Sequence, residues 1–146
     1  MTESDWRLFA VVRLRALTDE LGENDPQYRN EVSFTAAEWR RRLREHAQFA
    51  AFVSDTPVGL IGAQQETDDR VYLYSLWLDP KARGYGLARP LVAAALDWAR
   101  EHRARTVTLR VAADNAAARS VYESFGFTVA GPAVAAGEIA MSLSVS

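Results

Sequence analysis

The chain has 146 residues, of which 49% are hydrophobic and 25% are charged, a composition typical of one globular domain with a hydrophobic core. The formal net charge is −2, so no overall positive charge indicates a nucleic-acid partner. The sequence contains no cysteine, which excludes disulfides and thiolate metal sites. No apolar stretch reaches the roughly 18 residues that cross a bilayer, and no signal segment opens the chain. We therefore expect a cytoplasmic protein with no membrane partner.

The first 46 residues are predicted to form two helices. Thr2–Asp5 is a capping box, and the apolar residues between Trp6 and Leu21 recur at helical spacing. The polar stretch 22–33 predicts a loop. A second capping box, Thr35 with Glu38, begins the second helix. The arginine run in this helix, Arg40, Arg41, Arg42 and Arg44, and both histidines, His46 and His102, are expected on solvated helix faces rather than in metal or catalytic sites.

The middle of the chain changes to strand patterns. Runs at 48–54, 57–66 and 70–78 are separated by short polar links and predict an antiparallel meander. A loop and a helix then separate the third run from a strand at 106–111, an order that predicts a parallel crossover.

The last part of the chain predicts one helix and two closing strands. The helix begins near Asn115 and ends at Gly126. The strands follow at 127–132 and 138–144.

A glycine-containing loop, "PKARGYGLARPL" at Pro80–Leu91, joins the strand 70–78 to the N-terminus of the next helix. Unpaired N–H groups and the helix dipole make such a terminus a site for anions. Gly84 and Gly86 let the backbone approach a ligand closely. Positive charge is added by Lys81, Arg83 and Arg89. A plain strand-to-helix turn explains the glycines equally well, and the spacing matches neither a nucleotide P-loop nor a dinucleotide loop.

Two motifs together resemble the GNAT superfamily of N-acetyltransferases. Arg83-Gly84-Tyr85-Gly86-Leu87-Ala88 resembles the Q/R-x-x-G-x-G/A signature of that family. The segment Asn115–Phe127 is similar to its N-x-x-A-x-x-x-Y-x-x-x-G-F helix. An amphipathic helix with ordinary caps would explain much of the second segment alone. The pair in this order is much more specific, and the resemblance covers nearly the whole chain.

The resemblance implies an α/β fold, more closely an α+β mixed sheet of the GNAT type. The central sheet would be twisted, mostly antiparallel and splayed between strands 70–78 and 106–111, with about four helices around it. We expect one domain over residues 1–146. The family usually opens with a strand before the first helix, whereas residue 1 here already lies at the helix cap, so either the start is trimmed or the strand is absent. The run 48–54 would then be a bare apolar edge, from which we expect a homodimer.

The resemblance also implies acetyl-coenzyme A as co-substrate and no metal. The pyrophosphate would meet backbone N–H groups of Arg83, Gly84, Tyr85, Gly86, Leu87, Ala88 and Arg89. The pantetheine arm would pair with Leu76 and Leu78 like an added strand, with Asn115 and Tyr122 nearby. The N–H of Leu78 is then a candidate donor to the oxyanion.

Tyr122 occupies the position of the family's usual general acid for the departing sulfur. A phenol near pKa 10 is a weaker acid than a thiol near 8.5, so full proton transfer costs about 2 kcal/mol. We therefore expect Tyr122 to donate a hydrogen bond to developing negative charge on sulfur.

The general base is where the sequence departs from the family pattern. Many relatives carry a glutamate on the strand where this chain has Tyr74, and the run 70–78 contains no carboxylate. A lysine-like amine needs about 4.6 kcal/mol to become neutral at pH 7, an α-amine about 1 kcal/mol. Candidate bases or cation anchors near the loop after the first helix are Glu20, Glu23, Asp25 and Glu31. Candidate walls of the acceptor site are Tyr28, Tyr72 and Tyr85, although packing explains each of these better.

The function implied is transfer of an acetyl group to a primary amine of a small molecule or protein, by direct attack in a ternary complex. The alternative is a non-catalytic acyl-coenzyme A sensor or partner-binding domain. The missing base favours this alternative, and the presence of Tyr122 argues against it. A phosphate-binding module of another fold would leave Asn115–Phe127 unexplained.

Overall fold

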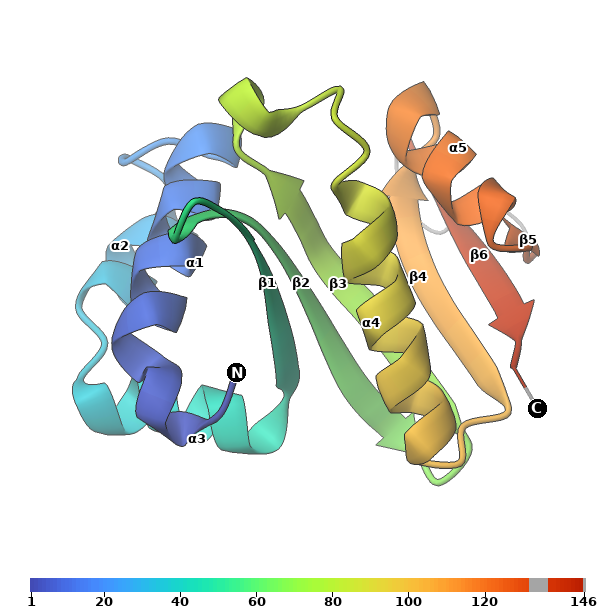
Figure 1. The fold of residues 1–146 in the computed structure, drawn as a ribbon, viewed down its shortest axis with the longest axis horizontal. Helices are drawn as coiled ribbons and strands as arrows, with labels where there is room; N and C mark the ends of the chain where they lie inside the picture. The colour runs from blue at the N-terminus through green and yellow to red at the C-terminus, as the bar shows by residue number, and fades with distance from the viewer. Residues whose placement is uncertain (132–136, 146) are drawn as a thin grey trace.

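A computed structural model describes residues 1–131 and 137–145, which form a six-stranded sheet with helices on both faces (Figure 1). The helices are η1 (Glu3–Asp5), α1 (Trp6–Glu20), α2 (Pro26–Val32), α3 (Ala36–Glu45), η2 (Pro80–Ala82), α4 (Ala88–Glu101) and α5 (Ala116–Ser124). The strands are β1 (Ala47–Val53), β2 (Thr56–Thr67), β3 (Arg70–Leu78), β4 (Thr106–Ala112), β5 (Thr128–Val129) and β6 (Glu138–Ser144).

The strand order is β1-β2-β3-β4-β6-β5, and all neighbours are antiparallel except the pair β3 and β4. The predicted meander and parallel crossover are both confirmed. Residues 70–73 of β3 pair with 106–109 of β4, and beyond these positions the two strands separate. The expected mixed sheet with a splay between these strands is therefore present.

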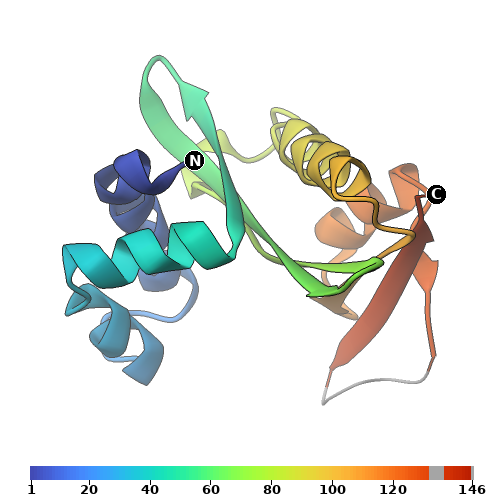
Figure 2. The same ribbon diagram turned by 90° about the horizontal axis from the view of Figure 1, so that it is seen from below.

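The helices form two layers on opposite faces of the twisted sheet (Figure 2). Helices α1, α2 and α3 lie on one face, and α4 and α5 lie on the other. The α4 and α5 side holds the larger core, with Leu96 and Phe127 among its fully buried members. The second core lies under α1 and α3, where Phe9 and Trp39 pack against Trp77 of β3. The C-terminal end of β3 thus contributes to both cores.

Capping residues fix several of the helix ends as predicted. Thr35 Oγ1 accepts the N–H of Glu38 at 3.2 Å at the start of α3. Gly126 takes φ +101° just after α5, the left-handed conformation expected of a helix-ending glycine. The Thr2–Asp5 box caps the short η1 helix, and α1 begins only at Trp6.

The predicted loop at 22–33 is wrong, because it contains helix α2. Asp25 caps α2 by accepting the N–H of Gln27 at 2.8 Å, and Pro26 occupies the first turn. The described residues therefore hold five α-helices rather than about four. The pattern of apolar residues did not reveal this helix, because the residue that it buries is the carboxylate Glu31.

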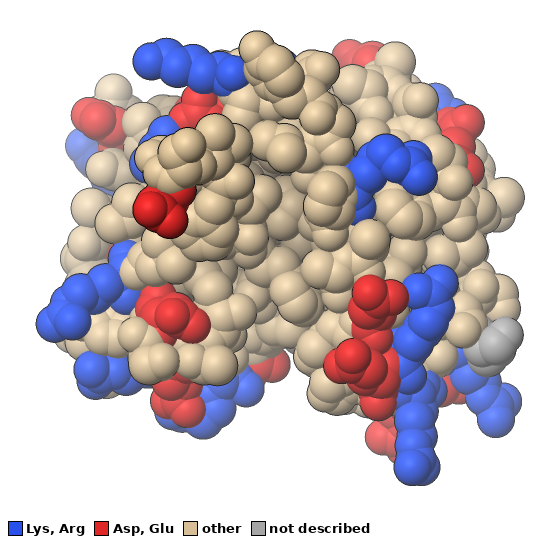
Figure 3. Space-filling model, viewed as in Figure 1, with Lys and Arg blue, Asp and Glu red and all other residues tan. Residues whose placement is uncertain are grey.

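The expected strand 127–132 is observed only at Thr128–Val129, and Pro132 lies outside the described residues. β1 lies at the sheet edge and pairs with β2. The Met1 ammonium group donates to the carbonyl oxygen of Gln48 at 2.7 Å. A hollow of about 410 Å³, lined mostly by uncharged residues, lies between α1 and α4 beside β1 (Figure 3). Within residues 1–131 and 137–145, no helix has the length and apolar character that crossing a membrane requires.

Candidate active site

A cleft of about 570 Å³ lies where β3 and β4 separate. Strand β3 contributes Leu76 and Leu78 to its wall, and the loop before α4 contributes Arg83, Gly84 and Gly86. The remaining predicted residues on the wall are Leu87 and Ala88 at the start of α4 and Asn115 at the start of α5. Most of the predicted cofactor residues are therefore gathered around one cleft.

A β-bulge at Ser75 shapes the β3 side of the cleft. Leu60 of β2 pairs with Trp77, and Gly62 pairs with Tyr74, so one residue of β2 faces two residues of β3. Ser75 has φ +57°, a left-handed conformation that is uncommon for residues other than glycine.

The bulge shifts the alternation of side chains along β3 by one residue. Before the bulge, Val71 and Leu73 point into the α4 core. After it, Leu76 and Leu78 pack on that side, and Trp77 turns to the α1 side. The residues expected to bind the cofactor thus reach the cleft because of the bulge.

The backbone after the bulge also presents a free edge to the cleft. Asp79 N–H donates to the carbonyl oxygen of Val58 on β2 at 2.7 Å. N–H directions alternate along a strand, so the N–H groups of Leu76 and Leu78 point away from β2 and toward the cleft. An extended ligand can pair with this edge as an added strand.

The loop before α4 presents a second set of donors. The backbone N–H groups of Gly86, Leu87 and Ala88 have no acceptor within the described part of the chain, and Leu87 makes no side-chain cap. Gly84 and Gly86 have φ +88° and +76°, and an added Cβ on either would meet no atom within 4 Å. Free donors at a helix N-terminus with open space in front of them fit a pyrophosphate.

The loop arginines contribute less free charge than the sequence suggested. Arg83 donates to the Leu78 carbonyl oxygen at 3.1 Å and to Asp19 at 2.8 Å. Arg89 is bonded to Ser124 and lies over the ring of Phe125. Both guanidinium groups therefore have partners within the protein, but only Arg83 is paired with a carboxylate.

Asp19, which sequence reasoning missed, links three parts of the site. Its Oδ2 atom accepts from Trp77 Nε1 at 2.9 Å as well as from Arg83. The last turn of α1 is thereby attached to β3 and to the glycine loop. No local sequence signal could have found this contact, because its partners lie about 60 residues away.

Tyr122 is 5% exposed and packs edge-on against Phe127, with ring centroids 5.7 Å apart. Burial, with a smaller effect of Tyr72, raises the pKa of Tyr122 to about 12. Its neighbour in the chain, Val121, lines the cleft. Such a phenol remains protonated under all ordinary conditions and can act as a hydrogen-bond donor.

The structure separates the four candidate carboxylates. Glu20 is exposed but lines the cleft, where desolvation by neighbouring groups raises its pKa, opposed by the charge of Arg13. Asp25 caps α2, and Glu23 is exposed. Glu31 is 2% exposed and bonded to Arg13. Glu20 is therefore the one of the four that combines a place on the cleft wall with no role in a cap or buried ion pair.

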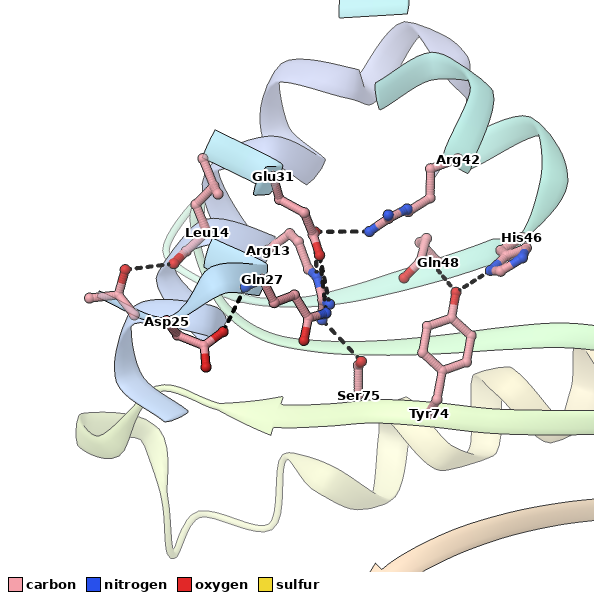
Figure 4. A network of polar contacts seen from close by, with 11 residues as sticks. Arg13, Leu14, Asp25, Gln27, Glu31, Arg42, His46, Gln48, Tyr74 and Ser75 are labelled. Carbon is pink, nitrogen blue, oxygen red and sulfur yellow. Dashed lines mark hydrogen bonds and ion pairs between the residues drawn. The ribbon is translucent and has the colours of Figure 1, made fainter. Parts of the chain in front are cut away.

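Glu31 belongs instead to a buried polar network under α1 (Figure 4). It accepts from Arg13 Nε at 3.0 Å, from Arg42 at 2.8 Å and from Gln27 at 3.1 Å. Burial opposes its ionisation, but the hydrogen bonds and charges of its partners outweigh burial and lower the pKa of Glu31. Glu31, one of the four candidate bases or cation anchors, is thus bound in a buried ion pair, and Arg42 is not part of a wholly solvated face.

Tyr74 points away from the cleft. Its hydroxyl accepts from Gln48 Nε2 at 2.7 Å and is 2.5 Å from His46 Nδ1 (Figure 4). The ring lies over Gly62, where an added Cβ would come within 2.5 Å of it. Tyr74 thus fills the space toward β1, and His46 is half-buried rather than on a solvated helix face.

The other tyrosines and the second histidine have different surroundings. Tyr28 lines a separate groove with Trp77, and Tyr85 is 79% exposed on the glycine loop. Tyr72 is half-buried and stacks on Tyr74 with 6.2 Å between ring centroids. His102 is exposed, as expected. Across the described residues, no cluster of three or more His, Asp or Glu side chains is placed to hold a metal ion.

Comparison with known proteins identifies the family. Residues 14–127 match the model of the acetyltransferase (GNAT) family. The chain is 42% identical over 73 residues to a mycothiol acetyltransferase of Corynebacterium glutamicum (strain R), over 50% of this chain and 25% of that protein. It is 28% identical over 136 residues to a mycothiol acetyltransferase of Brachybacterium faecium, over 87% of this chain and 39% of that protein. The matched regions are thus less than half of these relatives.

The fold is similar to that of the PaiA N-acetyltransferase from Thermoplasma acidophilum, whose crystal structure is a complex with coenzyme A. The TM-score is 0.74 over 99% of this chain and 95% of that chain, at 16% sequence identity. At this identity the likeness concerns the fold alone. The match to the family model over residues 14–127 shows that the chain belongs to the GNAT acetyltransferase family, as its two motifs predicted.

Proposed function

We propose that this chain transfers an acetyl group from acetyl-coenzyme A to a primary amine by direct attack in a ternary complex. One observation carries the proposal: two sets of backbone donors, on the glycine loop and on the free edge of β3, line the same cleft. Acetyl-coenzyme A supplies the acetyl thioester. Its anionic and amide-containing parts match the two sets of donors.

Each set of donors has its own task. The N–H groups of Gly86, Leu87 and Ala88, together with the dipole of α4, would bind the pyrophosphate. The edge at Leu76 would pair with the pantetheine arm. The N–H of Leu78 would donate to the thioester oxygen as negative charge develops there during attack.

Tyr122 would donate a hydrogen bond to the departing sulfur. With its pKa raised to about 12, the phenol is about 3.5 units less acidic than an ordinary thiol, a gap of about 5 kcal/mol. Complete transfer of its proton to a free thiolate is therefore strongly unfavourable. Tyr122 stabilises partial charge on sulfur in the transition state and keeps its proton.

Glu20 would attract the ammonium form of the acceptor and take up its proton. Its position on the cleft wall and its raised pKa suit both tasks, because a base is most effective with a pKa nearer the working pH. The names of the curated relatives, mycothiol acetyltransferases, support a small molecule as the acceptor.

A panel of amines tests the proposal. An amino sugar, a polyamine and a peptide with a free α-amine are each incubated with acetyl-coenzyme A and protein. Free thiol is measured, and the acetylated amine is identified by mass spectrometry. At least one small amine should give equal amounts of thiol and acetylated product. Acetyl-coenzyme A binding without product from any amine would instead support the acyl-coenzyme A sensor.

A further inference from the structure

The bulge at Ser75 is held by one side chain from helix α1, which covers the face of the sheet opposite the cleft and α4. Arg13 Nη1 donates to Ser75 Oγ at 3.0 Å, across 62 positions of sequence (Figure 4). Arg13 lies in the middle of α1 and is 8% exposed, on the same buried face as Phe9 and Ala16. A guanidinium group therefore occupies a core position and points at the one left-handed residue of β3.

Three neighbours fix the direction of this guanidinium. Glu31 accepts from Arg13 Nε at 3.0 Å and from Nη2 at 3.3 Å, which is a two-point contact. Glu31 is held in turn by Arg42 of α3 and Gln27 of α2. With its Nε and Nη2 atoms bound in this way, Arg13 has Nη1 left to reach the strand. The three helices α1, α2 and α3 thus meet in a clamp on Ser75.

General stability is a poor explanation for this arrangement. A buried ion pair contributes little compared with apolar side chains of the same volume, because both charges lose their hydration. Ser75 also adopts a conformation that costs about 1 kcal/mol for a residue with a Cβ. The arrangement does, however, fix the backbone one residue before Leu76.

We propose that Arg13 is a positioning residue that acts through Ser75 to hold the N–H groups of Leu76 and Leu78 toward the cleft. This inference rests on the proposed function for the role of those N–H groups. The donors can bind an extended ligand tightly only if their direction is fixed beforehand. The clamp supplies that preorganisation from the face of the sheet opposite the main core.

The test separates position from stability with three substitutions, a matched pair to glycine and one that restores the contact. Ser75→Gly removes the contact with Arg13 and relieves the left-handed strain. Ser54→Gly relieves similar strain at φ +49° in the turn between β1 and β2, outside β3. Ser75→Asn restores an acceptor oxygen and tolerates the left-handed conformation. The melting temperature and the affinity for acetyl-coenzyme A, measured by calorimetry, are compared for all of them.

Ser75→Gly should bind acetyl-coenzyme A about 5- to 20-fold more weakly, with a melting temperature close to that of Ser54→Gly. Ser54→Gly should keep wild-type affinity, and Ser75→Asn should recover most of it. Nitrogen-15 relaxation of the ligand-free protein should show greater mobility of the Leu76 and Leu78 amides in Ser75→Gly. Unchanged affinity together with unchanged amide mobility in that variant would overturn the inference.

The ligand-free measurement keeps this inference distinct from the proposed function. Wild-type protein that fails to bind acetyl-coenzyme A would contradict the proposed function. The relaxation data would still decide whether Arg13 orders the bulge. Rigid Leu76 and Leu78 amides in Ser75→Gly would exclude the clamp whatever the ligand.

Discussion

The Arg83 Nε atom donates to the carbonyl oxygen of Leu78 at 3.1 Å, so the side chain that opens the glycine loop lies on the free edge of β3. The other end of the same guanidinium is bound by Asp19 of α1. Arg83 therefore fixes the strand edge relative to the helix N-terminus. These are the two surfaces that the proposed ligand must contact together.

Gly86→Glu should abolish the rise in melting temperature that acetyl-coenzyme A causes in the wild type. The new carboxylate would occupy the open space before α4 and repel a pyrophosphate. Gly22→Glu is the matched control, because Gly22 has a similar φ of +88° and open surroundings but lies at the end of α1. A full thermal shift in Gly86→Glu would place the anion elsewhere.

Tyr122→Phe should lower kcat by about 10- to 1,000-fold and leave the affinity for acetyl-coenzyme A nearly unchanged. The lost hydrogen bond acts on charge that forms only in the transition state. Because the folded pKa is raised to about 12, the wild-type rate should show no loss from Tyr122 ionisation up to pH 10. Steady-state rates at saturating acetyl-coenzyme A measure both effects. Wild-type turnover in Tyr122→Phe would show that Tyr122 contributes only to core packing and not to the reaction.

Glu20→Gln should lower the acetylation rate of a lysine-like amine by about 10-fold or more, because such an amine must lose a proton before attack. Cofactor affinity should not change. Glu23→Gln, an exposed carboxylate three residues away, is the control. In the wild type the rate should rise with pH through a midpoint above the ordinary glutamate value, since the pKa of Glu20 is raised. Equal rates in the two variants would exclude Glu20 as base or anchor.

Glu31→Gln should destabilise the fold by about 3 kcal/mol at pH 7, because Arg13 would keep its charge and lose its counter-ion. The folded pKa of Glu31 is lowered, so its contribution is complete above about pH 4.3 and is lost as pH falls through the folded value. The difference between variant and wild type should therefore shrink below pH 4. Urea unfolding of wild type and variant at pH 7 and pH 3.5 measures this difference in the free energy of unfolding.

Glu45→Gln is the control for that experiment. Glu45 pairs with Arg41 on the surface of α3, where 53% of its side chain is exposed. Surface pairs of this kind contribute little, so the free energy of unfolding should hardly change at either pH. A constant difference between Glu31→Gln and wild type from pH 7 to 3.5 would contradict the ion-pair explanation.

Local signals predicted the elements that depend on local physics. Thr35 with Glu38 marked a helix start, Gly126 marked a helix end, and alternation marked β3 to its observed boundaries. The same kind of signal could have revealed α2, since Asp25 followed by Pro26 is a good helix beginning. The pattern of apolar residues did not reveal α2, because the residue that this helix buries is a glutamate.

The parts of the site that depend on distant pairs could not be predicted. Ser75 looks like an ordinary polar strand residue, and only its register against β2 and its contact with Arg13 reveal a bulge. Glu31 looked like a free carboxylate for the same reason, since its partners Arg13 and Arg42 lie on other helices. Tyr74, expected at the position of the family's glutamate, carries its hydroxyl toward β1 rather than toward the cleft.

Titration of nitrogen-15-labelled protein with acetyl-coenzyme A tests the central claim most directly, because it reports each backbone N–H separately. We predict saturable shifts at the amides of Gly86, Leu87 and Ala88 on the loop and of Leu76 and Leu78 on the bulged strand. The hollow beside β1, lined by Phe49 and Ala94, should remain unchanged. Shifts confined to that hollow, or absent from both sets of donors, would contradict the account.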